Sequence, residues 1–468
     1  MSKTNGNYDL AVIGAGSAGF SAAITAAEQG AQVALIGYST IGGTCVNVGC
    51  VPSKTMIRAA ETLHQAKTAS RFHGIEASSS VTDWSAVMAD KTRLVSDLRQ
   101  AKYIDVLPSY ESITYREGKA RLVDGGISID GEMLKADKVI IATGSSASLP
   151  PIEGIADVPY LTSTTALELD HLPASMIVIG GGVIGCELGQ MFARMGTNVT
   201  VLCRSRLLPS GEPEISEALQ ESLEAEGVTV LCGAVYKSIT QNGDICLGYE
   251  RDGTHHDLIA EQVLVATGRR PNSDDLGLDE MGVELLSNGG IKVDDRMRTT
   301  RTGVYAVGDV TGRDMFVYMA ANGAKIASEN ALNSDSRQYD NSTMPEVIFT
   351  DPQVASVGLT EAAAREAGYS VKTSILGLEN VPRALAARDT RGLIKLVADA
   401  DTQKLIGAHI MAPEGADSIQ TAAIAIKVGM TTDQLGEMIF PYLTTVEGLK
   451  LAAQTFDKDV SKLSCCAG

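Results

Sequence analysis

Two cysteines near the beginning of the chain, Cys45 and Cys50, stand in the segment GGTCVNVGCVPSK, which spans residues 42–54. Their spacing suits one helical turn, which would bring the two sulfur atoms close enough for a disulfide bond. The two glycines before Cys45 would let a flat ring system approach the backbone. The alternative, half of a zinc site, would need a second Cys or His cluster. We therefore predict that Cys45 and Cys50 form a redox-active pair.

A second pair, Cys465 and Cys466, stands near the end of the sequence. Adjacent cysteines form only a strained disulfide, so this pair tends to stay a dithiol. Because soft thiolates select soft metal ions, we predict a soft-metal ligand pair, with an accidental or generic metal-binding tail as the alternative. The other cysteines stand singly in apolar or mixed segments, and each is predicted to be a small buried side chain: Cys186, Cys203, Cys232 and Cys246.

Two glycine-rich segments predict the elements that would position a nucleotide beside such chemistry. In this motif the first glycine makes a tight turn, the second lets backbone N–H groups reach a pyrophosphate, and the third lets helix and strand pack closely. Each segment has the G-x-G-x-x-G spacing: Gly14, Gly16 and Gly19 in the first, Gly180, Gly182 and Gly185 in the second. Around them we predict strands at 10–13, 32–36, 176–179 and 198–202, and helices at 21–29 and from the second motif toward residue 195.

Further strands end in turns that suit a bound nucleotide. Predicted strands lead into Thr143-Gly144, into Thr267-Gly268 and, through residues 305–308, to Asp309. Asp309 could accept hydrogen bonds from polyol hydroxyls, or it could cap the following helix. After residue 340 no glycine motif occurs. A third domain of mixed α/β type is predicted there, with strands at 345–358 and 393–411 and helices at 360–368 and 419–428.

Length and charge limit the class of protein. A chain of 468 residues is too long for one ordinary core and predicts two to four domains. The net charge of −18 argues against nucleic acid as a partner, because phosphate binding needs clustered basic residues. No apolar run is long enough for a transmembrane helix, and residues 1–8 lack the apolar core of a secretory signal. We therefore predict a cytoplasmic protein.

Taken together, these motifs closely resemble those of the flavin disulfide oxidoreductases, a family that includes glutathione reductase, lipoamide dehydrogenase and mercuric reductase. The resemblance covers nearly the whole chain, including Phe349-Thr350-x-Pro352 and Thr360-Glu361 near its C-terminal third. It implies an α/β fold with two Rossmann-like domains, for FAD and a nicotinamide coenzyme, and an α+β interface domain that forms a homodimer with shared active sites. The implied domains are 1–150 with 272–343 for FAD, 151–271 for NADPH, and 344–468 for the interface.

The same resemblance implies roles for individual residues. Cys50 would be the thiol nearest the flavin and Cys45 the exchanging thiol, while Lys54 would lie near the flavin and pair with Glu187. The residues implied to contact FAD are Gly14, Gly16, Gly19, Thr44, Lys54, Ala120, Thr143, Gly144, Asp309 and Val317. One position departs from the family pattern, because Gly37 stands where an acid usually holds the adenosine ribose.

The choice of nicotinamide coenzyme depends on the residue after the second strand of the second motif. An acid there would bind the 2′-hydroxyl of NADH, whereas arginine would accept the 2′-phosphate of NADPH. The sequence has Cys203 there, followed by Arg204 and Arg206, so NADPH is predicted; solvated surface arginines are the alternative. The residues expected at this site are Gly180, Gly182, Gly185, Glu187, Arg204, Arg206 and Gly268.

The segment 440–447 bears on the substrate. Family members that reduce disulfides carry a His-Pro motif there, whose histidine exchanges protons with the thiols. This chain has Tyr442 at that place, although the supporting acid, Glu447, is present. Because a phenol with a pKa of about 10 is a poor base at neutral pH, disulfide exchange is not the expected task, and a diverged inactive member is the alternative.

Tyr442 together with the Cys465–Cys466 tail resembles the mercuric reductase branch of the family, as do residues 380–386 and 456–460. The resemblance implies that Hg(II), arriving as a thiol complex, is taken by Cys465 and Cys466 of the partner subunit. It would pass to Cys45 and Cys50, with Tyr442 lining the pocket. The form is expected to be the catalytic core without an N-terminal metal-binding domain. A disulfide or dihydrolipoamide reductase and a non-catalytic Hg(II)-sequestering protein remain alternatives.

Overall fold

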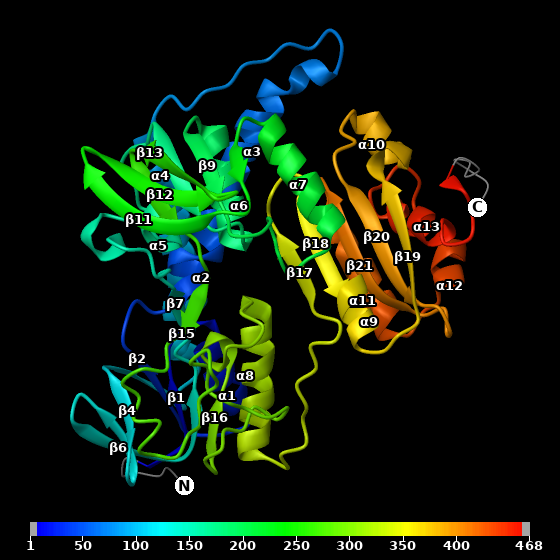
Figure 1. Cartoon of the computed structure of the whole chain (residues 1–468). Coiled ribbons are helices and arrows are strands. Elements are labelled where there is room, and N and C mark those ends of the chain that lie inside the picture. Colours follow the sequence, from blue (N-terminus) through cyan, green and yellow to red (C-terminus); the bar gives the residue numbers. More distant parts are fainter. Residues whose placement is uncertain (1–6, 461–468) are drawn as a thin grey trace. The chain divides into compact units, whose positions relative to one another are not determined.

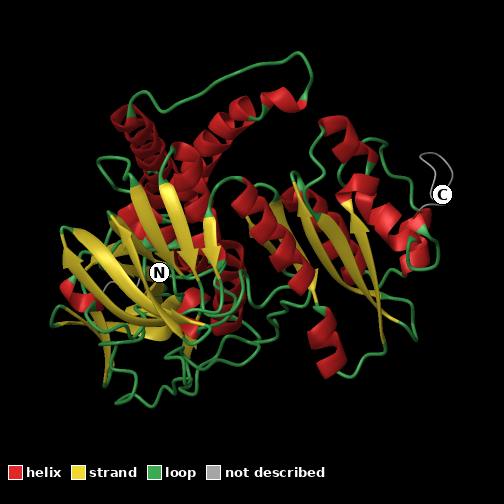
Figure 2. Ribbon diagram, turned by 45° about the horizontal axis from the view of Figure 1, so that its top comes forward, coloured by secondary structure: helices red, strands yellow, loops and turns green. Residues whose placement is uncertain are grey.

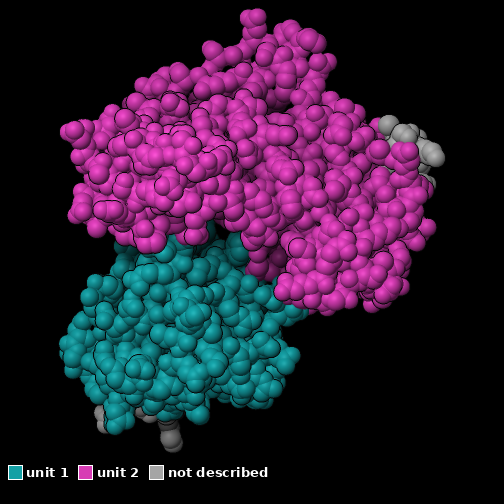
Figure 3. Space-filling view, in the orientation of Figure 1, with its two compact units in different colours: residues 1–55, 85–148, 268–341 teal, residues 56–84, 149–267, 342–468 magenta. Residues whose placement is uncertain are grey.

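The computed structural model describes residues 7–460, and the chain divides into two compact units (Figures 1 and 3). Unit 1 contains residues 1–55, 85–148 and 268–341, and unit 2 contains residues 56–84, 149–267 and 342–468. The three predicted domains stay a prediction, because the predicted NADPH and interface domains both fall in unit 2. Among the described residues no helix is long and apolar enough to cross a membrane, and the cytoplasmic location stays a prediction.

Unit 1 is built on a seven-stranded sheet of order β3-β2-β1-β6-β5-β4, with β16 also paired to β6. Strands β1, β2, β3, β6 and β16 pair in parallel, whereas β4, β5 and β6 pair antiparallel. A small two-stranded sheet joins β7 to β15. The strands are β1 Asn7–Ile13, β2 Val33–Gly37, β3 Ile113–Glu117, β4 Ala120–Val123, β5 Gly126–Ile129, β6 Glu132–Ile141, β7 Ser145–Ala147, β15 Arg269–Pro271 and β16 Val304–Ala306. The helices are α1 Ser17–Glu28, α2 Gly43–Val48, α4 Trp84–Arg99 and α8 Val317–Leu332, while α3 Cys50–Lys67 continues from unit 1 into unit 2.

The second half of the central strand β1, residues 10–13, is apolar at every position because both of its faces are buried there. Leu10 and Val12 belong to a core that includes residues of α1 and α8, whereas the alternate residues Ala11 and Ile13 belong to a second core on the other face. This alternation follows from the two-residue period of a strand. It fixes the register of β1 and so the place where the chain leaves the sheet, at the first glycine turn.

Unit 2 contains three sheets (Figure 2). A parallel sheet has the order β10-β9-β8-β14, an antiparallel one has the order β11-β12-β13, and a five-stranded one has the order β17-β18-β21-β20-β19. The strands are β8 Ser175–Ile179, β9 Asn198–Leu202, β10 Thr229–Leu231, β11 Val235–Asn242, β12 Asp244–Arg251, β13 Thr254–Ala260, β14 Gln262–Val265, β17 Pro345–Ile348, β18 Gln353–Gly358, β19 Val371–Gly377, β20 Leu393–Asp399 and β21 Leu405–Ala412. The helices are α5 Ser163–Ala166, α6 Val183–Met195, α7 Pro213–Ala225, α9 Glu361–Glu366, α10 Pro382–Ala387, α11 Gly415–Lys427, α12 Thr432–Glu437 and α13 Glu447–Gln454.

The elements differ from the sequence predictions in helix starts and in two strand segments. Helix α1 begins at Ser17, four positions before the predicted start at residue 21, because Gly16 is its N-cap and Gly19 packs inside its first turn. Helix α11 likewise begins at Gly415, four positions before the predicted start at residue 419. The segments 345–358 and 393–411 are each two antiparallel strands rather than one, since a turn interrupts each of them. Pro352 marks the first turn, whereas the second, residues 400–404, contains neither glycine nor proline.

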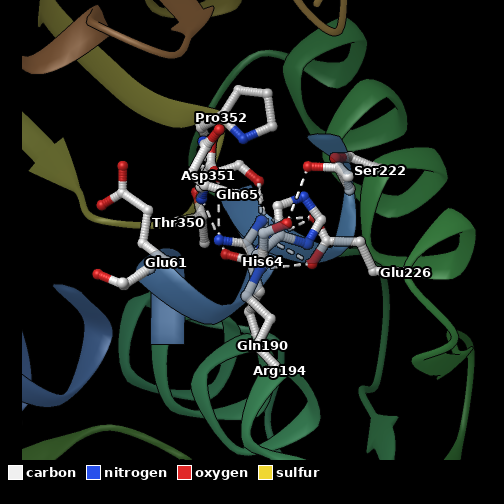
Figure 4. Close-up of polar contacts among 12 residues, drawn as sticks. Glu61, His64, Gln65, Gln190, Arg194, Ser222, Glu226, Thr350, Asp351 and Pro352 are labelled. Carbon is white, nitrogen blue, oxygen red and sulfur yellow. Dashed lines mark hydrogen bonds and ion pairs between the residues drawn. The ribbon is translucent and has the colours of Figure 1, made fainter. Parts of the chain in front are cut away.

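A buried cluster of charged side chains lies within unit 2 (Figure 4). Glu226, just after α7, accepts from Arg194 at 2.6 Å and from Arg391 at 3.0 Å, and Arg194 also contacts Asp351 at 3.0 Å. Burial lowers the pKa of the neighbouring His64. Removing one partner from such a cluster would leave an uncompensated buried charge, so the cluster ties α6 and α7 to the β17–β18 turn.

Trp84, the only tryptophan of the chain, is the first residue of α4. Its indole N–H donates a hydrogen bond of 2.9 Å to the carbonyl oxygen of Leu169. Both residues belong to unit 2, where Trp84 is the last residue of the segment 56–84, whereas the rest of α4 belongs to unit 1.

Candidate active site

The two predicted redox cysteines lie on two consecutive helices, α2 and α3, rather than on one helical turn. Cys45 is in α2, Cys50 is the first residue of α3, and Gly49 separates the helices with a backbone that is neither helical nor extended (φ −125°, ψ −114°). A side chain at Gly49 would approach the carbonyl oxygen of Thr44 to 2.9 Å, so the tight connection requires glycine. The predicted single helical turn is therefore wrong, although the structure still brings the two half-buried free thiols together.

The environment of Cys45 favours its protonated form. The hydrogen bond with Cys50, followed by burial, raises the pKa of Cys45, and the smaller influence of Lys54 acts in the opposite direction. The roles of Cys50 as the thiol nearest the flavin and of Cys45 as the exchanging thiol stay predictions.

The backbone of the cysteine segment is joined directly to the first glycine turn. Gly42 donates its N–H to the carbonyl oxygen of Ala15 at 2.9 Å, and Gly16 and Gly42 form an isolated parallel bridge. A side chain at Gly43, which has a φ of +65°, would approach the Cα of Gly16 to 2.6 Å. Two motifs that are separate in the sequence thus form one site in unit 1.

Three side chains to which the sequence analysis gave no role support the cysteine segment. Asn47 donates to the carbonyl oxygens of Ile41 and Gly43, each at 2.9 Å, and Arg99 of α4 donates to Asn47 at 3.0 Å. The hydroxyl of Tyr103 lies 3.2 Å from Ser17 at the start of α1. Burial raises the pKa of Tyr103, and the charges of both cysteines raise it further. No local pattern in the sequence marks Arg99 and Tyr103, because they approach the cysteines only through the fold.

Close packing requires the first and third glycines of both motifs, whereas a Cβ at the middle glycines, Gly16 and Gly182, would meet no atom closer than 3.6 Å. A side chain at Gly14 would collide with the carbonyl oxygen of Ala142, and one at Gly19 would collide with the carbonyl oxygen of Gly14. The second motif repeats this arrangement, with Gly180 against Ala266 and Gly185 against Gly180. Helices α1 and α6 begin directly after Gly16 and Gly182, so their free N–H groups point at the turns. Both turns therefore fit the pyrophosphate of a dinucleotide.

The predicted polyol acceptor, Asp309, lies in a polar group of unit 1. Its carboxylate accepts from the hydroxyl of Ser145 at 2.6 Å, and Arg269 lies 3.9 Å from the same oxygen. Burial lowers the pKa of Arg269. The nearby Thr143 donates to the carbonyl oxygen of Asn272 at 2.7 Å. Asp309 is thus held in place by its neighbours at the carboxyl end of β16.

The remaining residues predicted to contact the cofactors lie at the ends or starts of elements. Ala120 begins β4, Val317 begins α8, and Thr44 is in α2. Gly144 and Gly268 both have positive φ, at 73° and 110°. Glu187 is buried in α6 and accepts the backbone N–H of Phe349 at 2.8 Å. Its pairing with Lys54 stays a prediction.

At Gly37, the end of β2, the protein leaves no room for the missing acid. A side chain there would approach the hydroxyl of Tyr115 to 2.5 Å and the Cβ of Ala15 to 2.9 Å. Tyr115 comes from β3, where it pairs with Leu35. A phenol hydroxyl therefore stands beside the first glycine turn at the position where relatives in this fold would place an acid.

The end of β9 in unit 2 carries the residues predicted to select the coenzyme. Arg204 is exposed, whereas Arg206 is half-buried and donates to the carbonyl oxygens of Pro209 at 3.0 Å and Gly211 at 2.7 Å. Cys203 is buried and contacts Cys232, with 3.2 Å between their sulfur atoms. The prediction of a small buried side chain is confirmed for Cys186 and Cys203, whereas Cys232 and Cys246 are only partly buried.

This arrangement, two dinucleotide turns with a cysteine pair joined to the first, matches a known family. A family profile described as pyridine nucleotide-disulphide oxidoreductase matches residues 8–324, and its dimerisation domain matches residues 344–453. The chain belongs to the pyridine nucleotide-disulphide oxidoreductases. Its cofactors are FAD and NADPH, in keeping with this family and with its flavoprotein neighbours.

Relatives in sequence and in structure support the assignment to this family. A protein named mercuric reductase from Lysinibacillus sphaericus is 47% identical over 99% of this chain and 85% of its own length. Another with that name, from Streptomyces lividans, is 44% identical over the full length of both. Among solved structures, the HOCl-induced flavoprotein disulfide reductase RclA from Escherichia coli, as its Cu(II) complex, is 29% identical over 96% of this chain and 99% of its own, with a TM-score of 0.85. LpdA from Mycobacterium tuberculosis is 27% identical over the same shares, with a TM-score of 0.84.

The dimerisation domain of this family member contains Tyr442 in the loop between α12 and α13. Tyr442 is 52% exposed, and the neighbouring Ile439 is 97% exposed. Glu447 is buried and accepts the backbone N–H of Leu443 at 3.1 Å, so it shapes the loop that presents Tyr442. The predicted ligands Cys465 and Cys466 lie outside the described residues. Within residues 7–460 no three or more His, Cys, Asp or Glu side chains form a metal-binding group, so the zinc alternative finds no support there.

Proposed function

We propose that this chain uses NADPH to reduce Hg(II) to Hg(0) through Cys45 and Cys50. The observation that carries the proposal is the near full-length similarity to several proteins named mercuric reductase, at 43–47% identity. The reaction balances as NADPH and Hg(II) giving NADP⁺, a proton and Hg(0). Bound FAD supplies the two-electron relay between the coenzyme and the sulfur atoms.

The residues of unit 1 support this chemistry. Two thiolates are the ligands that a soft ion such as Hg(II) prefers. The hydrogen bond with Cys50 and burial raise the pKa of Cys45, so Cys45 must give up its proton when it binds the ion. The backbone of Gly42 and Gly43, held against the first glycine turn, lets a flavin ring lie beside the cysteines. The first turn would hold FAD and the second NADPH.

We further propose that the site is completed by a second copy of the chain. The dimerisation domain supports a homodimer. Met438, Ile439 and Leu443 are large exposed apolar side chains around Tyr442, as a surface covered by a partner would be. In this arrangement Cys465 and Cys466 of the partner subunit take Hg(II) from a small-thiol complex and pass it to Cys45 and Cys50, while Tyr442 lines the pocket.

One assay separates this function from its alternatives. NADPH oxidation is measured with HgCl₂ in excess thiol, with oxidised glutathione and with lipoamide. We expect NADPH oxidation to depend on HgCl₂ and to be slow with either oxidised glutathione or lipoamide. Faster turnover with a disulfide would favour the disulfide or dihydrolipoamide reductase, and Hg(II) binding without NADPH oxidation would favour a sequestering protein.

Tyr442→Phe tests the tyrosine. We expect slower Hg(II) turnover, by about tenfold, with flavin reduction by NADPH unchanged, because loss of a hydrogen bond to a charged group costs about 1.5–3 kcal/mol. Tyr369→Phe, an exposed tyrosine elsewhere in unit 2, is the matched control. Unchanged Hg(II) turnover in Tyr442→Phe would remove Tyr442 from the mechanism. Tyr442→His is not expected to give an efficient glutathione reductase, because the shape of the pocket also matters.

A mixed dimer tests transfer between subunits. One subunit carries Cys45→Ala and Cys50→Ala with an intact tail, and the other carries Cys465→Ala and Cys466→Ala with an intact redox pair. If the tail acts across the interface, one site per dimer is complete, and with Hg(II) held by excess dithiol the dimer should reach about half of wild-type turnover. Turnover no higher than the average of the two mutant homodimers would show that the tail does not act in the partner's site.

A further inference from the structure

Two thiols outside the catalytic pair meet at the edge of the parallel sheet in unit 2. Cys203 follows β9 and Cys232 follows β10, and these strands pair in parallel with Leu202 opposite Leu231. The backbone N–H of Cys203 donates to Leu231 at 2.9 Å. The two cysteines therefore leave neighbouring strands at the same level, and their sulfur atoms lie 3.2 Å apart.

One of these thiols is accessible and the other faces the coenzyme turn. Cys232 is partly buried, and its thiol lies 3.6 Å from the side-chain oxygen of Gln220. Cys203 is 3% exposed, and burial raises its pKa to about 12. A side chain at Gly181, inside the second glycine turn, would approach the Cβ of Cys203 to 3.0 Å and its sulfur to 3.3 Å. Cys203 thus fills the space behind the turn predicted to bind NADPH.

We propose that Cys203 and Cys232 form a second two-sulfur site for Hg(II), and that its occupation weakens NADPH binding. Hg(II) exchanges its ligands: its two Hg–S bonds to the delivering small thiols and the two S–H bonds of the cysteines break, and two new Hg–S bonds form. The two protons pass to the released small thiols, so no oxidant or reductant is consumed. Soft thiolates in a two-coordinate pair suit this ion and not the harder first-row ions. The proposal rests on the proposed function only for the identity of the ion.

The geometry explains the effect on the coenzyme. Even zinc, with bonds to sulfur of about 2.3 Å, would hold two ligating sulfurs well beyond their present separation, so an ion between them must push them apart. Cys232 can turn toward solvent, whereas Cys203 has the backbone of Gly181 behind it. If the sulfur of Cys203 is displaced, it therefore presses on the turn whose N–H groups would hold the pyrophosphate. By linkage, bound NADPH weakens Hg(II) binding at this site by the same factor.

The test uses the full-length, FAD-loaded protein in which Cys45, Cys50, Cys465 and Cys466 are all replaced by alanine. HgCl₂ is added in a monothiol buffer, and retained mercury and NADPH affinity are measured. We expect one Hg(II) per chain and an NADPH dissociation constant raised by about tenfold, within the usual range of coupling between sites. Adding Cys232→Ser should abolish both effects, whereas adding Cys246→Ser, another partly buried cysteine in unit 2, should leave both in place.

Three outcomes would overturn the proposal. In the first, the Cys232→Ser protein retains as much mercury as its parent. In the second, mercury is retained but the affinity for NADPH does not change. In the third, two thiols are lost without bound mercury, which would mean that the pair forms a disulfide instead. None of these measurements uses turnover. A failure of Hg(II) reduction in the unmodified protein would therefore count against the proposed function and not against this site.

Discussion

The first glycine turn, in unit 1, and the second, in unit 2, have nearly the same backbone but different neighbours. Gly16 and Gly182 cap their helices with φ/ψ of −89°/−170° and −83°/−172°. At the end of the following strand the two regions diverge. Gly37 faces the hydroxyl of Tyr115 in unit 1, and Cys203 faces Cys232 in unit 2.

This difference shows which part of a dinucleotide site has its residue types determined by steric collisions with the backbone. The turn cannot vary, because a side chain at the first or third glycine would collide with backbone oxygens in both units. The strand end, which would face the ribose, is constrained only by what packs beside it. We therefore expect the two pyrophosphate subsites to be alike, and we propose that side chains such as Tyr115 and Arg204 make the choice of nucleotide.

The largest effect is expected from replacing the third glycine, which both turns share. Gly19→Ala should release FAD, and Gly185→Ala should weaken NADPH binding with FAD retained, each by about 10- to 100-fold, because overpacking costs about 1–3 kcal/mol. Flavin content and the NADPH dissociation constant measure the two separately. Gly189→Ala, on the same helix as Gly185 with ordinary contact distances of 3.4 Å or more, is the control. If either variant lost both cofactors equally, this would contradict the prediction that each turn binds its own cofactor independently of the other.

A smaller and more selective effect is expected at the second strand end. The wild-type protein should prefer NADPH strongly to NADH. Arg204→Ala should raise the KM for NADPH by about tenfold and leave that for NADH unchanged, since a charged hydrogen bond contributes about 1.5–3 kcal/mol. Arg206→Ala should affect both coenzymes alike, because Arg206 holds the carbonyl oxygens of Pro209 and Gly211. A loss of NADPH selectivity confined to Arg206→Ala would reverse these roles.

The smallest effect is expected at the first strand end. We propose that the hydroxyl of Tyr115 takes the part of the missing acid toward the FAD ribose. Tyr115→Phe should then raise the FAD dissociation constant by about three- to tenfold, the value of one neutral hydrogen bond. Tyr110→Phe, which removes an exposed hydroxyl that contacts Glu28 in the same unit, is the control. The same FAD affinity in Tyr115→Phe and wild type would leave the ribose without this partner.

The sequence predicts those parts of the site that depend on local geometry. The glycine turns, the strand at 198–202 and the Cys45–Cys50 contact all follow from residues close together in the chain. The break between the two helices at Gly49 could not be predicted, because spacing alone does not report the backbone angles.

Contacts made by strand pairing were not predictable in this way. Cys203 and Cys232 meet only because β9 and β10 pair in one register, and Tyr115 reaches Gly37 only because β3 lies beside β2. Tyr103 and Arg99 approach the cysteine segment through helix packing in unit 1. Each of these contacts joins residues far apart in the chain, where neither motif nor periodicity carries information.

The single tryptophan has a practical consequence for studying how the two units unfold. Trp84 and its hydrogen-bond acceptor Leu169 both belong to unit 2, whereas the turn expected to hold FAD belongs to unit 1. During a denaturant titration, indole fluorescence follows the loss of the Trp84–Leu169 contact in unit 2, whereas flavin release follows the loss of the FAD turn in unit 1. Coincident midpoints would mean one cooperative transition, and separate midpoints would mean that one unit persists while the other has already lost its structure.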